Sequence, residues 1–78
     1  MPYLLIKDKY KTVFEGKIEN ISCYNKNGLF DILTDHSNFI SIIENKIIIR
    51  ATGVEQEIGV ANALIKVKDN KIYIYVGV

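Results

Sequence analysis

The side chains that could carry acid–base or metal chemistry gather in the stretch NGLFDILTDHSNF, residues 27–39. It holds Asp31, Asp35 and His36, which is the only histidine of the chain. A histidine beside a carboxylate is a candidate general base, and two carboxylates with an imidazole suit a divalent cation. Catalysis also needs a nucleophile or a substrate pocket, and three ligands from one loop need a second ligand-bearing segment. Neither is evident, so we predict no catalytic residue, no metal ligand and no cofactor.

Cys23 is the other reactive side chain and the only cysteine of the chain. A pair with His36 is conceivable, but the alternation of apolar residues places Cys23 on the inward side of a predicted strand, where a thiol is usually unreactive packing. A single cysteine also excludes an internal disulfide. The five glycines are scattered without phosphate-loop spacing, so we expect no nucleotide-binding loop.

Length and charge narrow the possible classes further. The chain has 78 residues, which suffice for one domain, residues 1–78, with one modest core. Ten basic and nine acidic residues give a net charge of +1, so no strong field attracts nucleic acid or anionic lipid. The longest apolar runs are far shorter than a membrane helix, and the N-terminus does not resemble a signal peptide. We predict a protein that does not insert into the membrane.

Apolar residues recur at every second position, which is the pattern of half-buried β-strands. Asn27-Gly28, Glu44-Asn45 and Asp69-Asn70 separate apolar runs and predict three hairpin turns. So many short strands predict an all-β fold with two packed sheets or a closed barrel. The predicted strands cover residues 3–7, 11–15, 17–24, 29–33, 39–43, 47–51, 54–60, 64–67 and 71–76.

The alternation slips by one residue in GKIENISC, between Ile18 and Ile21. A β-bulge near Glu19 and Asn20 would return both isoleucines to the core side. The inward positions of all the strands then predict a core that contains Phe14, Ile18, Ile21, Phe30, Ile32, Ile47, Ile49, Val67, Ile72 and Ile74.

Tyrosines and lysines alternate in KVKDNKIYIY near the C-terminus. Aromatic platforms beside lysines are how small β-folds bind single-stranded nucleic acid. A free-standing sandwich or barrel of this kind is therefore an alternative function, and its binding residues would be Lys66, Lys68, Lys71, Tyr73 and Tyr75. The balanced charge favours the simpler interpretation, in which the tyrosines are good strand formers on an outer face.

The stretch VFEGKIENISCYNKNGLFDILTDHSNFIS, residues 13–41, resembles the N-terminal β-sandwich of the epsilon subunit of rotary F-type ATP synthases, called delta in mitochondria. The resemblance runs without a gap and extends over essentially the whole chain. The family's aromatic, glycine, apolar and histidine positions are occupied here by Phe14, Gly16, Ile18, Ile21, Cys23, Gly28, Phe30, Ile32, Leu33, His36 and Phe39. It implies a two-sheet β-sandwich of about nine to ten short strands.

Four departures from the family pattern affect what can be expected. Asp31 stands where glycine is usual, and Thr34 and Asp35 replace a Pro-Gly pair. Asn62-Ala63 replaces a Gly-Gly pair, and alanine is disfavoured at positive φ, so the local backbone is expected to differ. Family members continue into a helical hairpin, whereas this sequence stops at Val78, so we expect no C-terminal helical hairpin.

The resemblance implies a non-catalytic coupling subunit of the central stalk, with the gamma subunit and the membrane c-ring as partners in ATP synthesis driven by protons or sodium ions. It implies a peripheral position on the cytoplasmic face of the membrane, with a bacterial source. It also implies that the ring is met by a polar contact loop, for which we predict Gly28, Leu29, Asp31, Thr34, Asp35, His36 and Ser37.

Overall fold

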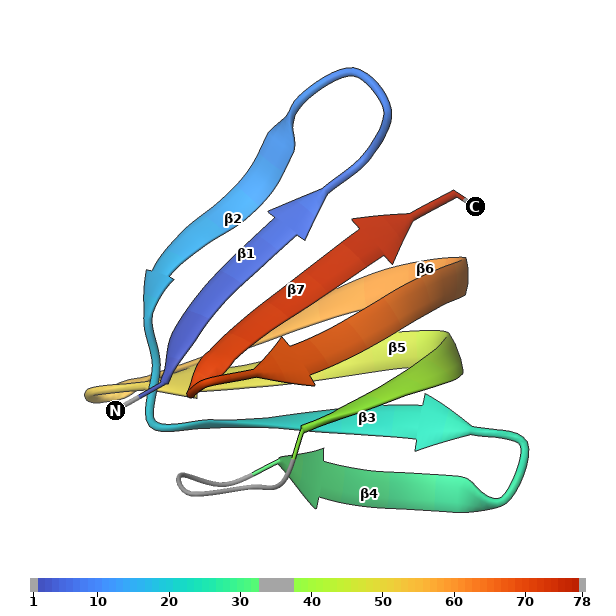
Figure 1. The fold of residues 1–78 in the computed structure, drawn as a ribbon. Coiled ribbons are helices and arrows are strands. Elements are labelled where there is room, and N and C mark those ends of the chain that lie inside the picture. The colour runs from blue at the N-terminus through green and yellow to red at the C-terminus, as the bar shows by residue number, and fades with distance from the viewer. Residues whose placement is uncertain (1, 33–37, 78) are drawn as a thin grey trace.

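The structure is a computed structural model that describes residues 2–32 and 38–77. Seven strands form one hydrogen-bonded sheet in the order β2-β1-β7-β6-β5-β3-β4 (Figure 1). The predicted all-β class is confirmed, but the predicted number of nine to ten strands is wrong, and the described strands are joined in one sheet. None of the described residues forms a helix long and apolar enough to cross a membrane. The strands are β1 (Tyr3–Lys7), β2 (Thr12–Lys17), β3 (Asn20–Asn25), β4 (Gly28–Ile32), β5 (Phe39–Ala51), β6 (Val54–Lys68) and β7 (Lys71–Val76).

The strand count falls because β5 and β6 are long strands of 13 and 15 residues. Each of them contains two of the predicted strands, and the predicted hairpin at Glu44-Asn45 is absent. Asn45 does have the positive φ expected there, 75°, but the pairing with β6 continues on both sides of it after a register shift. Asparagine tolerates this positive φ, but here the conformation forms a bulge that bends the strand, whereas a turn would have ended it.

The long hairpin divides the sheet into two halves because each strand changes neighbours along its length. Residues 63–68 of β6 pair with β7, whereas residues 44–50 of β5 pair with β3. The β7 half thus contains β2, β1, β7, residues 63–68 and residues 39–43. The β3 half contains β4, β3, residues 44–51 and residues 54–60. Figure 1 shows β5 and β6 curving from one half into the other.

One core lies between the two halves, as expected for a sandwich-type domain. All eight aliphatic residues of the predicted core are confirmed as buried, whereas Phe14 and Phe30 are only half-buried at its margin. The ring of Phe30 makes an edge-to-face contact with Phe39, with centroids 6.5 Å apart. The core also contains Leu4, Ile6, Cys23, Ile43, Val60, Ala63 and Ile65.

The predicted strand over residues 17–24 is in fact two pieces. β2 ends at Lys17, and β3 begins at Asn20. Between them the Ile18 N–H donates to the Pro2 carbonyl at 3.0 Å, and the Glu19 N–H donates to the Arg50 carbonyl at 2.8 Å. Ile18 and Ile21 are both buried as predicted, but a break between strands, where the chain passes from one half to the other, replaces the predicted bulge.

The other two predicted turns are confirmed. Gly28 has φ 114° at the β3–β4 turn, and Asp69 and Asn70 have φ 52° and 63° at the β6–β7 turn. Two consecutive positive φ values are typical of the tight turn that matches strand twist in a hairpin. Asn62 and Ala63, by contrast, have negative φ and lie within β6, so this part of the backbone is ordinary strand.

Replacing Ile74 with alanine should lower the free energy of unfolding by about 2–5 kcal/mol. Its side chain is fully buried in the core, and truncation leaves a cavity there. The matched control is Ile40→Ala, since Ile40 is 64% exposed and should cost less than about 1 kcal/mol. Urea unfolding of the three proteins measures both changes. Equal midpoints for Ile74→Ala and the parent chain would place Ile74 outside the core.

Candidate interaction surfaces

Three of the seven predicted loop residues lie in the described part of the chain, and all three belong to strand β4. Gly28 begins the strand, Leu29 is 57% exposed, and Asp31 is exposed one residue before the strand ends. Gly28 and Asp31 therefore lie toward opposite ends of β4. The other four predicted residues, Thr34, Asp35, His36 and Ser37, lie outside the described residues.

Asp31 is held by neighbouring strands in a polar network that the sequence did not indicate. Its carboxylate accepts a hydrogen bond from the Ser22 hydroxyl at 2.5 Å. The Ser22 oxygen in turn accepts one from Nη1 of Arg50 at 2.6 Å. Arg50 also donates to Asn20 Oδ1 and Glu55 Oε1, each at 3.0 Å.

This polar network joins β4, β3, β5 and β6 across the outer face of the β3 half. Ser22 is only 1% exposed, so its hydroxyl needs the partners it has on both sides. Arg50 is the only arginine of the chain, and its planar group carries several N–H donors in fixed directions, which a lysine lacks. The network therefore fixes the register of four strands. Asp31 is a structural member of it as well as a surface carboxylate.

A second ion pair lies on the same face. Nζ of Lys46 is 3.0 Å from Oε1 of Glu57, and the hydrogen bond that Lys46 donates to this carboxylate raises the pKa of Lys46 above its usual value. The outer face of the β3 half thus carries charges that are paired within the chain. Such a face is well solvated and has little drive to associate.

The outer face of the β7 half is different, because several apolar side chains are exposed on it, whereas Leu29 is exposed on the outer face of the β3 half beside the paired charges. Ile40 is 64% exposed, Ile42 58% and Tyr75 37%. The strand pairing places Ile42, Leu64 and Tyr75 in one row across the sheet. The next row on this face consists of Ile40, Lys66, Tyr73 and Leu5. A contiguous apolar patch on a small domain is typical of a protein-binding surface. We call it the apolar face: Leu5, Ile40, Ile42, Leu64, Tyr73 and Tyr75.

The lysines and tyrosines of the nucleic-acid alternative share this outer face. Lys66 lies opposite Tyr73 across the β6–β7 pair, and Lys68 lies opposite Lys71. Ile65, Val67, Ile72 and Ile74 between them are buried, so the five predicted side chains alternate outward as expected. The structure brings the five side chains together. Of the two tyrosines, Tyr75 is exposed and Tyr73 is half-buried.

The predicted position of Cys23 on the inward side of a strand is confirmed. Cys23 is fully buried, and burial raises the pKa of its thiol to about 12, with a smaller contribution from the Asp31 carboxylate. A group with so high a pKa stays a neutral thiol at physiological pH and is a poor nucleophile. Within residues 2–32 and 38–77, no three His, Cys, Asp or Glu side chains are placed to hold a metal ion.

The structure is a bent open sheet of the sandwich type, with ion pairs on one outer face and exposed apolar side chains and lysines on the other. Residues 4–77 match the family model of the ATP synthase delta/epsilon chain, beta-sandwich domain, and the chain belongs to this family. A search of curated protein sequences found no match.

Solved structures agree in fold. A chain of the Euglena gracilis mitochondrial ATP synthase (OSCP/F1/c-ring) superposes with a TM-score of 0.86 at 12% identity, covering 94% of this chain and 48% of that one. A chain of the Tetrahymena thermophila mitochondrial ATP synthase (central stalk/c-ring) gives 0.81 at 18% identity, covering 95% and 61%. This chain therefore spans roughly half of the length of one match and three fifths of the other.

The buried thiol predicts a specific pH dependence of stability. An unperturbed cysteine thiol has a pKa of 9.0, so above this pH the unfolded chain loses a proton that the folded chain keeps. The free energy of unfolding should therefore fall as the pH rises from 9.0 to about 12, by at most about 1.4 kcal/mol per pH unit from this group.

Urea unfolding of the parent and a Cys23→Val variant across this range tests the effect. Tyr3 and Lys46, whose pKa values are also raised, contribute equally to both proteins. The variant should show the shallower decline. A second measurement is thiol labelling at neutral pH, where the folded chain should react far more slowly than the unfolded chain. Rapid labelling of the folded chain would show that Cys23 is accessible.

Proposed function

We propose that this chain is a non-catalytic coupling subunit of the central stalk of a rotary ATP synthase, which links the gamma subunit to the membrane ring. The proposal rests on the family match over residues 4–77. The exposed apolar side chains of Ile40, Ile42 and Tyr75 support it, because they offer a surface that a partner subunit can cover. The position implied is peripheral, at the membrane surface, in a complex whose coupling ion is a proton or a sodium ion.

The apolar face is the side that suits gamma. Ile40, Ile42 and Tyr75 are exposed there, and burying such side chains is the main favourable term in a permanent interface. Packing over an apolar area transmits torque because it resists shear across the whole contact. The ring would instead meet the polar segment that follows β4, where Asp35 and His36 supply orienting charges at a rim.

The test measures association of this chain with the gamma subunit and the c-ring encoded in the same genome. The parent chain should co-purify with gamma and attach to detergent-solubilised c-ring in the presence of gamma. An Asp35→Ala/His36→Ala double variant should lose about tenfold in ring affinity, equivalent to about 1.4 kcal/mol. It should retain gamma, since we propose that gamma contacts the apolar face, to which neither residue belongs. Asp31 is left intact because its bond to Ser22 would confound stability with binding.

Lys9→Ala/Lys11→Ala in the β1–β2 loop is the matched control, since both side chains are exposed and neither belongs to the predicted contact loop. The control should bind both partners like the parent. Loss of gamma with unchanged ring binding in the double variant would mean that the two surfaces are exchanged. Failure of the parent chain to bind gamma at all would overturn the proposal.

Binding of single-stranded nucleic acid is the second candidate function, because Lys66, Lys68, Lys71, Tyr73 and Tyr75 do share one face. We expect no saturable binding of a labelled oligonucleotide even at low salt, since the chain's net charge is only +1 and stacking also needs a basic groove. Fluorescence anisotropy during a salt titration checks this. Binding that weakens steeply with salt, and that Tyr75→Ala reduces, would favour the second function.

A further inference from the structure

The bend in the long hairpin leaves two inner stretches of strand unpaired on one side. Residues 40–43 of β5 pair with β6 but, among the described residues, with no strand on their other side. Residues 54–60 of β6 likewise pair with β5 alone within the described part of the chain. Together with the outer edges of β2 and β4, four edges of the sheet are therefore open within residues 2–32 and 38–77. The N–H and C=O groups along an open edge are a template for a further strand.

Charged side chains protect three of these four edges against such pairing. β2 carries Glu15 and Lys17, β4 carries Asp31, and residues 54–60 carry Glu55 and Glu57. Charges on an edge are a common protection against strand addition.

The fourth edge lacks this protection. Residues 40–43 read Ile-Ser-Ile-Ile, without a charge or a proline. Ile40 and Ile42 are also the most exposed aliphatic side chains of the apolar face, at 64% and 58%.

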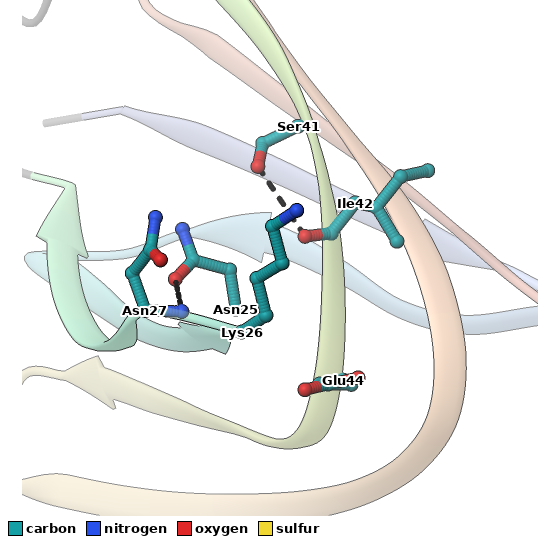
Figure 2. Close-up of a pocket in the computed structure, with 6 residues that line it drawn as sticks. All are labelled: Asn25, Lys26, Asn27, Ser41, Ile42 and Glu44. Atoms are coloured by element: carbon teal, nitrogen blue, oxygen red, sulfur yellow. Dashed lines mark hydrogen bonds between the residues drawn. The ribbon is translucent and has the colours of Figure 1, made fainter.

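A groove runs beside this edge. It has a volume of about 360 Å³ and lies between the β3–β4 turn and the edge (Figure 2). β3 pairs with the part of β5 from Glu44 to Arg50. The bulge beside Glu44 turns the earlier part of β5 away from the β3–β4 turn, and the groove lies between the two. Four residues of strand are about 13 Å long, so the edge offers room for a short extended segment. The lining residues are Asn25, Lys26, Asn27, Ser41, Ile42 and Glu44.

The charges around the edge indicate what segment fits. Lys26 lies across the groove, and Figure 2 shows its side chain reaching toward Ser41 and Ile42. Lys66 and Lys68 line a second hollow of about 250 Å³ that includes Ile40. Among the described residues that line the two hollows, Glu44 is the only acidic one. A segment that carries an acidic residue is therefore favoured over a basic one.

We propose that residues 40–43 receive an extended segment of the gamma subunit as an eighth strand of the sheet. This inference rests on the proposed function, because it specifies how gamma is held beside the apolar face. The segment is apolar at alternate positions, which contact Ile40 and Ile42, and carries an acidic residue near Lys66 and Lys68. Main-chain hydrogen bonds supply affinity in this mode, and the alternate side chains supply specificity.

Amide hydrogen exchange, resolved by residue, tests the proposal on the full chain alone and in complex with gamma. Alternate amides within residues 40–43 already bond to β6 and should change little. The remaining ones should exchange at least about tenfold more slowly in the complex, since each gains a hydrogen bond. The amides of residues 54–60 form a matched open edge on the same hairpin, and their exchange should not change.

Two pairs of variants test the side-chain part. Ile42→Lys should weaken gamma binding at least about tenfold, whereas Val54→Lys, at a position that is 60% exposed, should not. Lys66→Glu/Lys68→Glu should weaken binding by a similar factor that shrinks as salt rises, whereas Lys9→Glu/Lys11→Glu should have no effect. Circular dichroism confirms that each variant is folded.

The outcomes separate this inference from the proposed function. A gamma complex that forms while all amides of residues 40–43 exchange as in the free chain would overturn the eighth strand and leave the stalk role intact. No complex with gamma would overturn both. If sedimentation shows that the chain alone dimerises and the same amides are protected in the dimer, the occupant is a second copy, and the assignment to gamma is wrong.

Discussion

The need to bury both halves of an open sheet around one core is the constraint on which the rest of the structure depends. A chain of 78 residues cannot build two cores, and a flat seven-stranded sheet would leave one apolar face in water. The β5–β6 hairpin solves this by belonging to both halves. Its bulge at Asn45 bends the sheet, so Ile43 before the bend and Ile47 after it enter the same cluster. The short strands then extend each half outward from this hairpin.

The same bend produces the difference between the two outer faces. In the β3 half, Arg50 links Asn20, Ser22 and Glu55, and Ser22 links Asp31, so the polar groups satisfy one another within the chain. In the β7 half, the start of β5 leaves its β3 neighbour and carries Ile40 and Ile42 to an open edge. A surface that satisfies its own charges has little reason to bind a partner, whereas exposed aliphatic side chains gain from being covered. The bend in the β5–β6 hairpin thus gives the two outer faces of the domain different chemical character.

The sequence by itself determined the all-β class, the first and last strands of the chain and most of the core. The period of two is a local property, and it located Tyr3–Lys7 and Lys71–Val76 without error because each pairs along its whole length. The turns at Asn27-Gly28 and Asp69-Asn70 were also predictable, since few residues accept positive φ. The family resemblance was confirmed by the match over residues 4–77. It rested on the order of glycine, aromatic and apolar positions, which a linear sequence displays directly.

Only the tertiary structure decided whether Asn45 ends a strand or bends one, because both uses need the same backbone conformation and differ only in what β6 does opposite it. The polar network could not be predicted for a related reason. Ser22 and Arg50 are 28 residues apart, and nothing in their own neighbourhoods indicates that β3 and β5 will pair in a register that joins them. The open edge at residues 40–43 is likewise defined by a missing neighbour among the described residues. Local patterns determine which residues form strands and which side chains face inward, whereas pairing across the sheet determines which backbone groups remain available to a partner.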